Sequence, residues 1–419
     1  MKLRINILTY FIIYFYMLMA LYHYKIKTYF YWDYIAFLKE TSFDFSISRF
    51  LVATLLFFLN LYCLFQIKKT NLAFIIVSLF FALVTIPSLI SYTSANLYSH
   101  KLMSYHQLFF YALFIFSKIK INFRFPVIDK KQSLHLLVLI TTLGIVPYLI
   151  IYGPYINLKN LLLVDVYKTR SLMSSLSNPY FGYTYSIFTK IIIPLIIVFS
   201  IELKNKIYLF VGIFYLVLFY LFGAHKTVYA GLVLVLIFYK FSYEDSVKYI
   251  VRYSNVLIFL CFILALINID YGWILTFRRI HFIPALLDIC YLDFFEGKPL
   301  YWSDSILKGL IDYPYDLKHV NLIGKTYFNR AEMGANNGLV SEGYMNLGTW
   351  GVLINILLVS VYFSVLNSLK IPSKYFGLFF LVIFSFISSS VFTVFLTHGA
   401  IALLLVAVFL LNEKTDAKI

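Results

Sequence analysis

The sequence predicts an all-α, polytopic integral membrane protein with about 12 transmembrane helices and a large extracytoplasmic loop that contains short helices. Composition is the first observation behind this prediction. Of the 419 residues, 62% are hydrophobic and only 13% are charged, whereas soluble domains usually carry about 25% charged residues. The second observation is that apolar runs recur along the whole chain. A folded chain with so much apolar surface is stable in lipid rather than in water.

Twelve apolar ranges are expected to form the helices of a single membrane domain over residues 1–419, because a spanning helix needs about 20 mainly apolar residues. They are 5–24, 50–67, 72–90, 102–116, 134–151, 187–201, 207–221, 227–239, 256–270, 350–366, 375–396 and 400–411. The apolar patterns at 227–239 and 400–411 are the weakest indications of a spanning helix. The first run is longer than that of a signal peptide and lacks a small-residue cleavage site, so we expect a retained helix.

Basic residues predict the orientation, because cytoplasmic loops are enriched in Lys and Arg. The segment 117–133 has the strongest excess of basic residues. Its single acid is Asp129, and its basic residues are Lys118, Lys120, Arg124, Lys130 and Lys131. Both termini are therefore expected in the cytoplasm. The net charge of +16 is spread over many short loops, which does not predict a nucleic-acid-binding surface.

This orientation leaves two large outer loops, 152–186 and 271–349. From Asp270 to Gly348 the second holds 9 of the 19 acidic residues in the chain. Residues 280–292 and 303–311 have the pattern of short amphipathic helices, the second with Ser303 as its N-cap. Helices of this kind lie on the membrane surface and would cover a cavity. Long loops in compact proteins are often functional.

Acidic residues are missing from the interiors of the expected spans, although Asp270 is the last residue of the ninth. A charge at mid-bilayer costs roughly 2.5–3.5 kcal/mol on insertion scales, so proteins keep one there for a function. Proton- or sodium-coupled transporters usually use such carboxylates. Their absence favours other function classes over a coupled transporter.

Basic residues gather instead at the expected outer boundary, at Arg170, Lys226 and the pair Arg278-Arg279. Guanidinium groups form bidentate bonds with phosphate. These four residues are candidates for binding a pyrophosphate, without a metal or another cofactor. The alternative is that they extend to lipid headgroups.

The stretch from Ala335 to Gly351 has the most distinctive pattern. Its first half predicts a short helix that ends in a glycine turn, after which the chain re-enters the membrane, with Gly348 and Gly351 allowing close packing at the bend. Glu342 is a candidate general base, and Asn337 is a candidate substrate-binding residue. No P-loop, nucleotide-sugar motif, Ser-His-Asp set or metal motif occurs in the sequence.

In layout the chain resembles the Wzy-type oligosaccharide repeat-unit polymerases, the O-antigen polymerase group. Three stretches carry the resemblance: Gly223-Ala224-His225-Lys226, Phe277-Arg278-Arg279-Ile280, and the segment from Asn337-Gly338 to Gly348-Thr349-Trp350-Gly351. The related O-antigen ligases have His, then Asn, Ser or Gln, nine residues, and Gly-x-x-Gly. This spacing is kept with Asn337 in the histidine position, which favours a polymerase over a ligase. Polymerases also often have an outer-loop arginine followed by glycine, similar to Arg170 and Gly182.

The resemblance implies a bacterial inner-membrane glycosyltransferase. Its reaction would transfer a growing glycan from undecaprenyl pyrophosphate to a new lipid-linked repeat unit of O-antigen or capsular polysaccharide. Arg278, Arg279, Arg170 and Lys226 would stabilise the leaving pyrophosphate. Tyr344 and Trp350 would contact sugars, or else anchor at the headgroup level. Its partners would be the lipid-linked oligosaccharide and membrane lipids. A polysaccharide chain-length regulator is a further candidate partner. The alternatives are a polysaccharide ligase or other lipid-linked-sugar glycosyltransferase and a flippase.

Overall fold

The computed structural model describes residues 6–29, 44–95, 97–122, 125–162, 164–176, 178–225 and 227–413. Over these residues the chain is helical, and none of them lies in a named strand. They form two compact units. Unit 1 comprises the described residues of Met1–Ile121, Tyr243–Asn367 and Phe386–Phe392. Unit 2 comprises those of Asn122–Ser242, Ser368–Ser385 and Thr393–Ile419. Each unit is therefore considered by itself.

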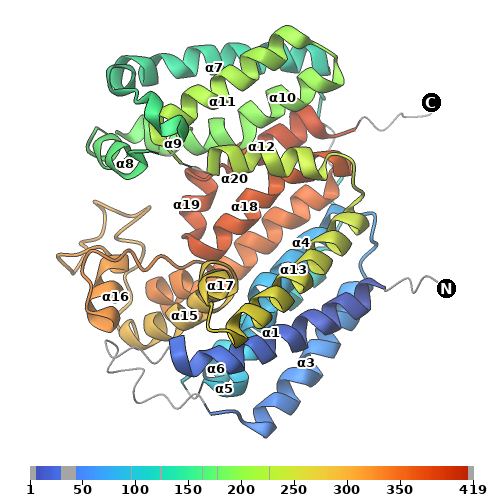
Figure 1. The fold of residues 1–419 in the computed structure, drawn as a ribbon, viewed down its shortest axis with the longest axis vertical. Helices are drawn as coiled ribbons and strands as arrows, with labels where there is room; N and C mark the ends of the chain where they lie inside the picture. Colours follow the sequence, from blue (N-terminus) through green and yellow to red (C-terminus); the bar gives the residue numbers. More distant parts are fainter. Residues whose placement is uncertain are drawn as a thin grey trace. The chain divides into compact units, whose positions relative to one another are not determined.

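Unit 1 is built from the N-terminal helices and from the segment that follows residue 243. Its elements are α1 (Ile7–Tyr29), α3 (Ile47–Phe65), α4 (Leu72–Phe80), η1 (Phe81–Thr85), α5 (Ile86–Ser94), α6 (His100–Phe116), α13 (Tyr243–Leu266), α14 (Tyr271–Trp273), η5 (Ile274–Phe282), α15 (Ile283–Phe294), α16 (His319–Phe328) and α17 (Leu339–Ser368). Helix α1 packs along α13 (Figure 1). The first and middle parts of the chain are thereby brought together.

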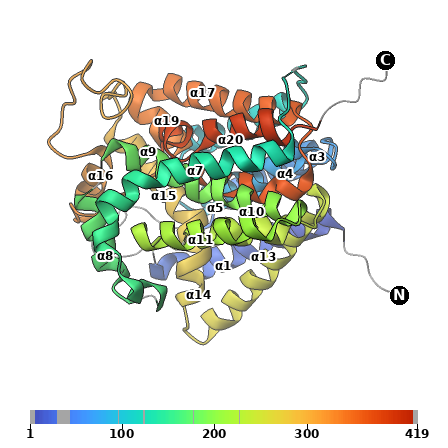
Figure 2. The same ribbon diagram turned by 90° about the horizontal axis from the view of Figure 1, so that it is seen from above.

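Unit 2 holds the remaining helices. They are α7 (Lys130–Tyr152), η2 (Gly153–Tyr155), η3 (Leu158–Leu162), α8 (Val166–Ser175), α9 (Pro179–Ile187), η4 (Phe188–Ile192), α10 (Ile193–Glu202), α11 (Lys206–Gly223), α12 (Thr227–Phe238), η6 (Ser373–Tyr375), α20 (Ala400–Val406) and η7 (Ala407–Leu411). Helices α18 (Phe376–Ser388) and α19 (Val391–Leu396) are each divided between the two units. Helices α10 and α11 lie side by side (Figure 2).

The predicted class, a polytopic helical membrane protein, is confirmed at this level. Among the described residues, eight helices are long and apolar enough to cross a membrane. Three shorter apolar helices, Val228–Phe238, Ser373–Ser388 and Ala400–Leu411, coincide with other expected spans. The expected total of twelve is not confirmed. The short helices include the two ranges with the weakest hydropathy pattern.

Burial separates helices at the centre of unit 1 from those at its periphery. The continuous run Leu72–Ser94 is 94% buried over its most apolar window, whereas Ile47–Phe65 is only 28% buried. In α3 the side chains of Leu51, Leu55 and Tyr62 are exposed, and Phe57 is buried on the opposite face. An apolar side chain on an exposed face is stable when that face meets lipid.

The expected outer loop 271–349 contains more buried helix than its composition predicts. Residues 280–292 do form helix, in η5 and α15, but most of α15 is buried in unit 1 instead of lying on a surface. The prediction of a second helix at 303–311 is wrong. Trp302 and Gly309 have positive φ angles there, and the backbone forms successive turns. The second helix of the loop is α16, His319–Phe328.

The predicted bend in the last part of the loop is confirmed. Helix α17 is interrupted at Leu347 and Gly348, where Gly348 has φ 57° and ψ −138°. This region of φ favours glycine. A Cβ atom on Gly351 would lie 1.9 Å from the carbonyl oxygen of Gly343, and a Cβ on Gly343 would lie 2.6 Å from the oxygen of Gly351. The two glycines therefore allow the short first half of α17 to pack against the start of the second.

Aromatic side chains form the core of unit 2. The centroid of the Tyr148 ring in α7 lies 4.6 Å from that of Phe181 and 4.9 Å from that of Phe219.

At one end of α10, the carboxylate of Glu202 accepts bonds from Lys130 at 2.8 Å and Lys374 at 3.1 Å. These ion pairs join α7, α10 and η6 at the end of the helices.

Replacing Gly351 by alanine is expected to destabilise the protein, because the new methyl group meets backbone atoms that cannot move aside as a side chain can. Overpacking of this kind costs about 1–3 kcal/mol of unfolding free energy. Gly182→Ala is the matched control, since nothing lies within 4 Å of a Cβ at that helical position. Thermal unfolding of the purified protein in detergent measures both variants. Equal midpoints for the two would contradict the close approach at the bend.

Candidate functional site

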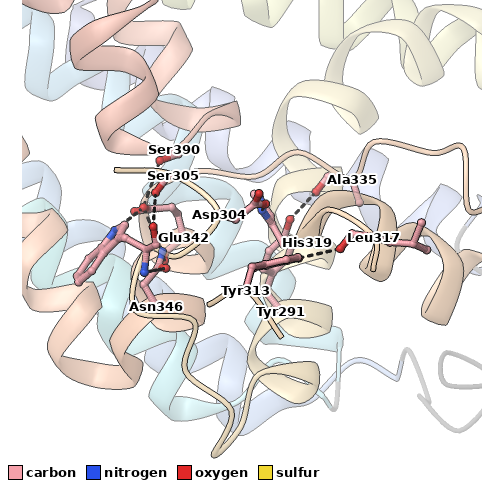
Figure 3. A network of polar contacts seen from close by, with 11 residues as sticks. Tyr291, Asp304, Ser305, Tyr313, Leu317, His319, Ala335, Glu342, Asn346 and Ser390 are labelled. Atoms are coloured by element: carbon pink, nitrogen blue, oxygen red, sulfur yellow. Dashed lines mark hydrogen bonds and ion pairs between the residues drawn. The ribbon is translucent and has the colours of Figure 1, made fainter. Parts of the chain in front are cut away.

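Glu342, the candidate base, lies in the first half of α17 with only 2% of its surface exposed. Its oxygen Oε1 accepts a hydrogen bond from the indole Nε1 of Trp302 at 2.9 Å. Asn346 and Ser390, labelled beside Glu342 in Figure 3, each donate to the same oxygen at 3.2 Å. Asn355 donates to Oε2. A carboxylate surrounded in this way is a buried anchor that joins α17, the turn at residue 302 and the segment before α19.

Asp304 and His319 form a second polar pair in unit 1, also drawn in Figure 3. Nδ1 of His319 lies 2.6 Å from Oδ2 of Asp304, and the two side chains are 23% and 19% exposed. Burial raises the pKa of Asp304, but the hydrogen bond and charge of His319 outweigh this and hold that pKa below its ordinary value. The carboxylate is thus ionised and accepts the Nδ1 proton. When the ring carries its single proton on Nδ1, its Nε2 atom is a proton acceptor.

Local packing holds this Asp–His pair in place. The ring of His319, at the start of α16, lies 6.3 Å from the ring of Tyr291 in α15. The Tyr291 hydroxyl donates to the carbonyl oxygen of Ala335 at 2.9 Å, and the Tyr313 hydroxyl donates to that of Leu317 at 2.8 Å. The first bond ties α15 to the segment before α17, and the second lies within the turns around residues 304–318.

A polar cleft of about 190 Å³ lies between the start of α6, the end of α15 and α17. Lys101, Asp293, Glu296 and Tyr344 line it, together with apolar side chains. Lys101 donates to the Tyr344 hydroxyl at 3.3 Å and lies 4.8 Å from the centre of its ring. The two carboxylates are exposed. Carboxylates, an ammonium group and a phenol together provide the acceptors and donors that sugar hydroxyl groups require.

Asn337, the candidate substrate-binding residue, belongs to a different buried cluster. Its amide donates to Asp288 Oδ1 at 3.0 Å, and Ser341 donates to the same oxygen at 2.6 Å. The other carboxylate oxygen of Asp288 lies 2.9 Å from Nε2 of His106. Asp288 is 3% exposed. The cluster therefore compensates a buried carboxylate with donors from α6 and α17.

A small cavity adjoins the Asp288 cluster. Its volume of about 20 Å³ is enough for about one water molecule. His106 and His281 both line it, and the Nε2 atom of His281 lies 2.6 Å from the Tyr14 hydroxyl. Burial lowers the pKa of His281 to about 3. This imidazole is therefore neutral at physiological pH.

Arg278 and Arg279 lie in η5, a nine-residue π-helical segment that leads directly into α15. Arg278 is half-buried and Arg279 is exposed. π-helical turns inside longer helices are rare and occur frequently at functional sites. Neither arginine is among the side chains that donate to the Glu342 carboxylate. The predicted catalytic set of Glu342, Arg278 and Arg279 is therefore not seen as one cluster.

Trp350 begins the second, apolar half of α17, and 72% of its surface is exposed. Tyr344, by contrast, is buried and lines the cleft. An exposed tryptophan at the end of a spanning segment is typical of the headgroup level of a membrane. The position of Trp350 favours that anchoring role over sugar contact.

Unit 2 holds the other predicted basic residues. Arg170, in α8, donates through Nε and Nη2 to the carbonyl oxygen of Ala224, at 3.1 and 2.8 Å. Ala224 has φ 48° and caps the end of α11. Arg170 thus neutralises the negative end of that helix. Lys226 lies outside the described residues.

Two further groups accompany Arg170 in unit 2. His225 follows Ala224, and its ring lies 5.7 Å from that of Tyr185 in α9. Burial, together with the positive charges of Arg170 and Lys190, lowers the pKa of His225. Burial and the charge of Lys190 lower the pKa of His398 to about 4. Lys190 is therefore close enough to both histidines to affect their charge.

Several of these residues were not predicted from the sequence. Lys190 stands inside the apolar range 187–201, so a search for basic as well as acidic residues in the spans would have found it. Asp304 and His319 are 15 residues apart in no recognisable motif. Among the described residues, no cluster of three or more His, Cys, Asp or Glu side chains is arranged for a metal ion.

The chain matches no protein-family model, no curated protein and no solved structure.

Removing the Glu342 carboxylate is expected to destabilise the protein because Trp302, Asn355 and Ser390 lose their acceptor. Each buried donor left without a partner costs about 1–3 kcal/mol. Glu342→Ala should therefore lower the unfolding midpoint in detergent, whereas Glu296→Ala, at an exposed carboxylate, should change stability by less than about 0.5 kcal/mol. A stable Glu342→Ala protein that has lost only its activity would identify Glu342 as a catalytic group instead.

Proposed function

We propose that the chain is a membrane-embedded glycosyltransferase that polymerises undecaprenyl-pyrophosphate-linked oligosaccharide repeat units. The reaction would take place at the outer face of a bacterial cytoplasmic membrane, with both termini in the cytoplasm. The observation that carries the proposal is the Asp304–His319 pair, a histidine oriented by a carboxylate outside the candidate spans of unit 1. The resemblance of three sequence stretches to repeat-unit polymerases supports the same reading.

Glycosyl transfer to a sugar hydroxyl requires a base for the hydroxyl proton. His319 meets this requirement better than Glu342. Its Nδ1 is held by Asp304 and its side chain is 23% exposed, whereas Glu342 is almost fully buried and its oxygens accept bonds from four side chains. We therefore assign the base role to Nε2 of His319, with Asp304 as a positioning residue.

The cleft at Lys101, Asp293, Glu296 and Tyr344 is the proposed site for the acceptor sugar. Helix α15 connects the two sites, because Tyr291 packs on His319 and Asp293 lines the cleft. The hydroxyl of Tyr327, in α16, donates to Asp293. A sugar in the cleft would donate its hydroxyl protons to the two carboxylates and accept from Lys101.

In the proposed reaction the acceptor hydroxyl oxygen attacks the anomeric carbon of the donor glycan. The bond from that carbon to the pyrophosphate oxygen breaks, and the hydroxyl proton passes to Nε2 of His319. Undecaprenyl pyrophosphate leaves with the bonding electrons. Arg278 and Arg279 are the proposed groups that stabilise the developing negative charge, since guanidinium groups form short, charge-assisted bonds with phosphate oxygens.

Replacing Arg278 or Arg279 by alanine is expected to abolish chain growth and leave single repeat units, because the leaving pyrophosphate loses its positive partner. The measurement is the length distribution of surface polysaccharide on gels, in cells whose own gene is deleted and which carry each variant at equal membrane abundance. Lys325→Ala, at an exposed basic residue of α16, is the control and should give normal polymer. Normal polymer in both arginine variants would remove them from the site. Loss of even the single unit on deletion would favour a flippase.

Replacing His319 by glutamine should lower polymer formation by about 10²–10⁴-fold, the usual contribution of a general base. Asp304→Asn should have a smaller effect in the same direction, because it removes the group that orients the imidazole. His100→Gln provides the control, since His100 is an exposed histidine of unit 1 that bonds to Tyr92. Incorporation of labelled repeat units into polymer by membrane vesicles measures the rates. Unchanged rates for His319→Gln would overturn the assignment.

A further inference from the structure

Lys190 occupies an unusual position for a lysine. It is the twelfth residue of the 24-residue candidate span Pro179–Glu202 and lies in the π-helical segment η4. At 1.5 Å per residue, each end of this span is about 17 Å away along the axis. A mid-span lysine costs roughly 2.5–3.5 kcal/mol to insert, so its presence requires an explanation.

Two segments of unit 2 pack on η4 around this lysine. A Cβ on Gly231 of α12 would lie 3.3 Å from the carbonyl oxygen of Thr189 and 3.7 Å from the Cα of Lys190. Gly399, which follows His398 and has φ 93°, would place a Cβ 2.7 Å from Ile191. Close packing through glycines therefore brings α12 and the turn before α20 onto the helical turn that carries Lys190.

The corner between α11 and α12 brings His225 and, through a bond to Ala224, Arg170 to the same part of unit 2. A Cβ on Gly223 would lie 2.4 Å from the Tyr185 hydroxyl and 2.9 Å from the His225 ring, so this corner packs on α9, which leads into η4. Arg170 is bonded to the same corner through Ala224. Lys190, Arg170, His225 and His398 thus come from four segments and face a common region of unit 2.

No carboxylate balances this cluster among the residues that the structure describes. The ion pairs of unit 2 join Glu202 to Lys130 and Lys374, at the far end of the span. Asp165 is the described acid nearest in sequence to Arg170, and its recorded partner is Asn157. Neither Lys190 nor Arg170 has an ion pair with a described acid. The Nδ1 atom of His398 is buried without a hydrogen-bond partner.

We propose that Lys190, Arg170, His225 and His398 form an anion-binding site in unit 2 that takes a phosphate or diphosphate group. A multiply charged anion fits best, because two permanent cations and two protonatable imidazoles surround the same region. The position of Lys190 in a candidate span, near turns that join other helices, suits a headgroup that a lipid presents at the membrane boundary. The identity of that lipid as undecaprenyl phosphate or pyrophosphate rests on the proposed function, whereas the anion site itself does not.

Binding of inorganic pyrophosphate to the purified full-length chain in neutral-lipid nanodiscs tests the site. Isothermal titration calorimetry should detect binding by the wild type, and Lys190→Met should weaken it at least tenfold. Lys190→Arg keeps the charge and should retain binding. Lys206→Met, at an exposed lysine of the same unit, is the matched control and should bind as the wild type does. His398→Gln provides a second loss variant if Lys190→Met fails to fold.

Absence of pyrophosphate binding by the wild type, or equal binding by the wild type, Lys190→Met and His398→Gln, overturns the site. Adding undecaprenyl phosphate to the nanodiscs identifies the source of the anion. Competition with pyrophosphate indicates a lipid headgroup, and its absence indicates a soluble phosphate compound; both outcomes support an anion site. The proposed glycosyl transfer fails separately, through normal polymer formation by His319→Gln, and that result leaves pyrophosphate binding unaffected.

Discussion

Compensation of buried charge is the constraint that organises the polar part of this protein. An unpaired charge or unsatisfied polar group within apolar helices is expensive, so each one must find partners or a function. Three carboxylates meet this requirement in different ways: Glu342 through neutral donors, Asp288 through His106, Ser341 and Asn337, and Glu202 through two lysines. Each cluster joins helices that are distant in sequence. Lys190 lies inside a candidate span and has no ion pair with a described acid, which is why we propose a bound anion as its partner.

Hydropathy predicted the helices well where a segment is apolar throughout, because a run of about 20 apolar residues is best explained by a membrane-spanning helix. Each expected range coincides with helix, although the helices often extend beyond it, as α13 does with its polar start at Tyr243. The turn at Gly348 was also predictable, since the local pattern requires a glycine. The helix at 280–292 was also predicted, but its burial was not, because Asp288 marks the segment as polar. Only the tertiary partners of Asp288 make its burial possible.

The candidate site was predicted less well, for a physical reason. Asn337, Glu342 and Tyr344 are close in sequence, and successive residues of a helix face different directions. They consequently join three different clusters: the Asp288 network, the Trp302 anchor and the cleft at Lys101. The Asp304–His319 pair depends on turns whose positive φ angles at Tyr301 and Trp302 no sequence pattern announces. Local motifs identify residues that belong to a functional region, but the pairing of those residues depends on long-range packing.

The environment of Glu342 also argues against the alternative of an ion-coupled transporter. Candidate span Leu339–Ser368 does include this carboxylate, which the shorter expected range 350–366 excluded. A coupling carboxylate must exchange its proton or sodium ion with water during each cycle. Glu342 lines neither the cleft nor the small cavity described above, and side-chain donors occupy both of its oxygens. Opening this cluster to water would leave Trp302 and Asn355 without acceptors at the junction of the two halves of α17. A structural role for Glu342 is therefore compatible with catalysis by the more exposed Asp304–His319 pair, whereas ion coupling through Glu342 would require the bend itself to unpack.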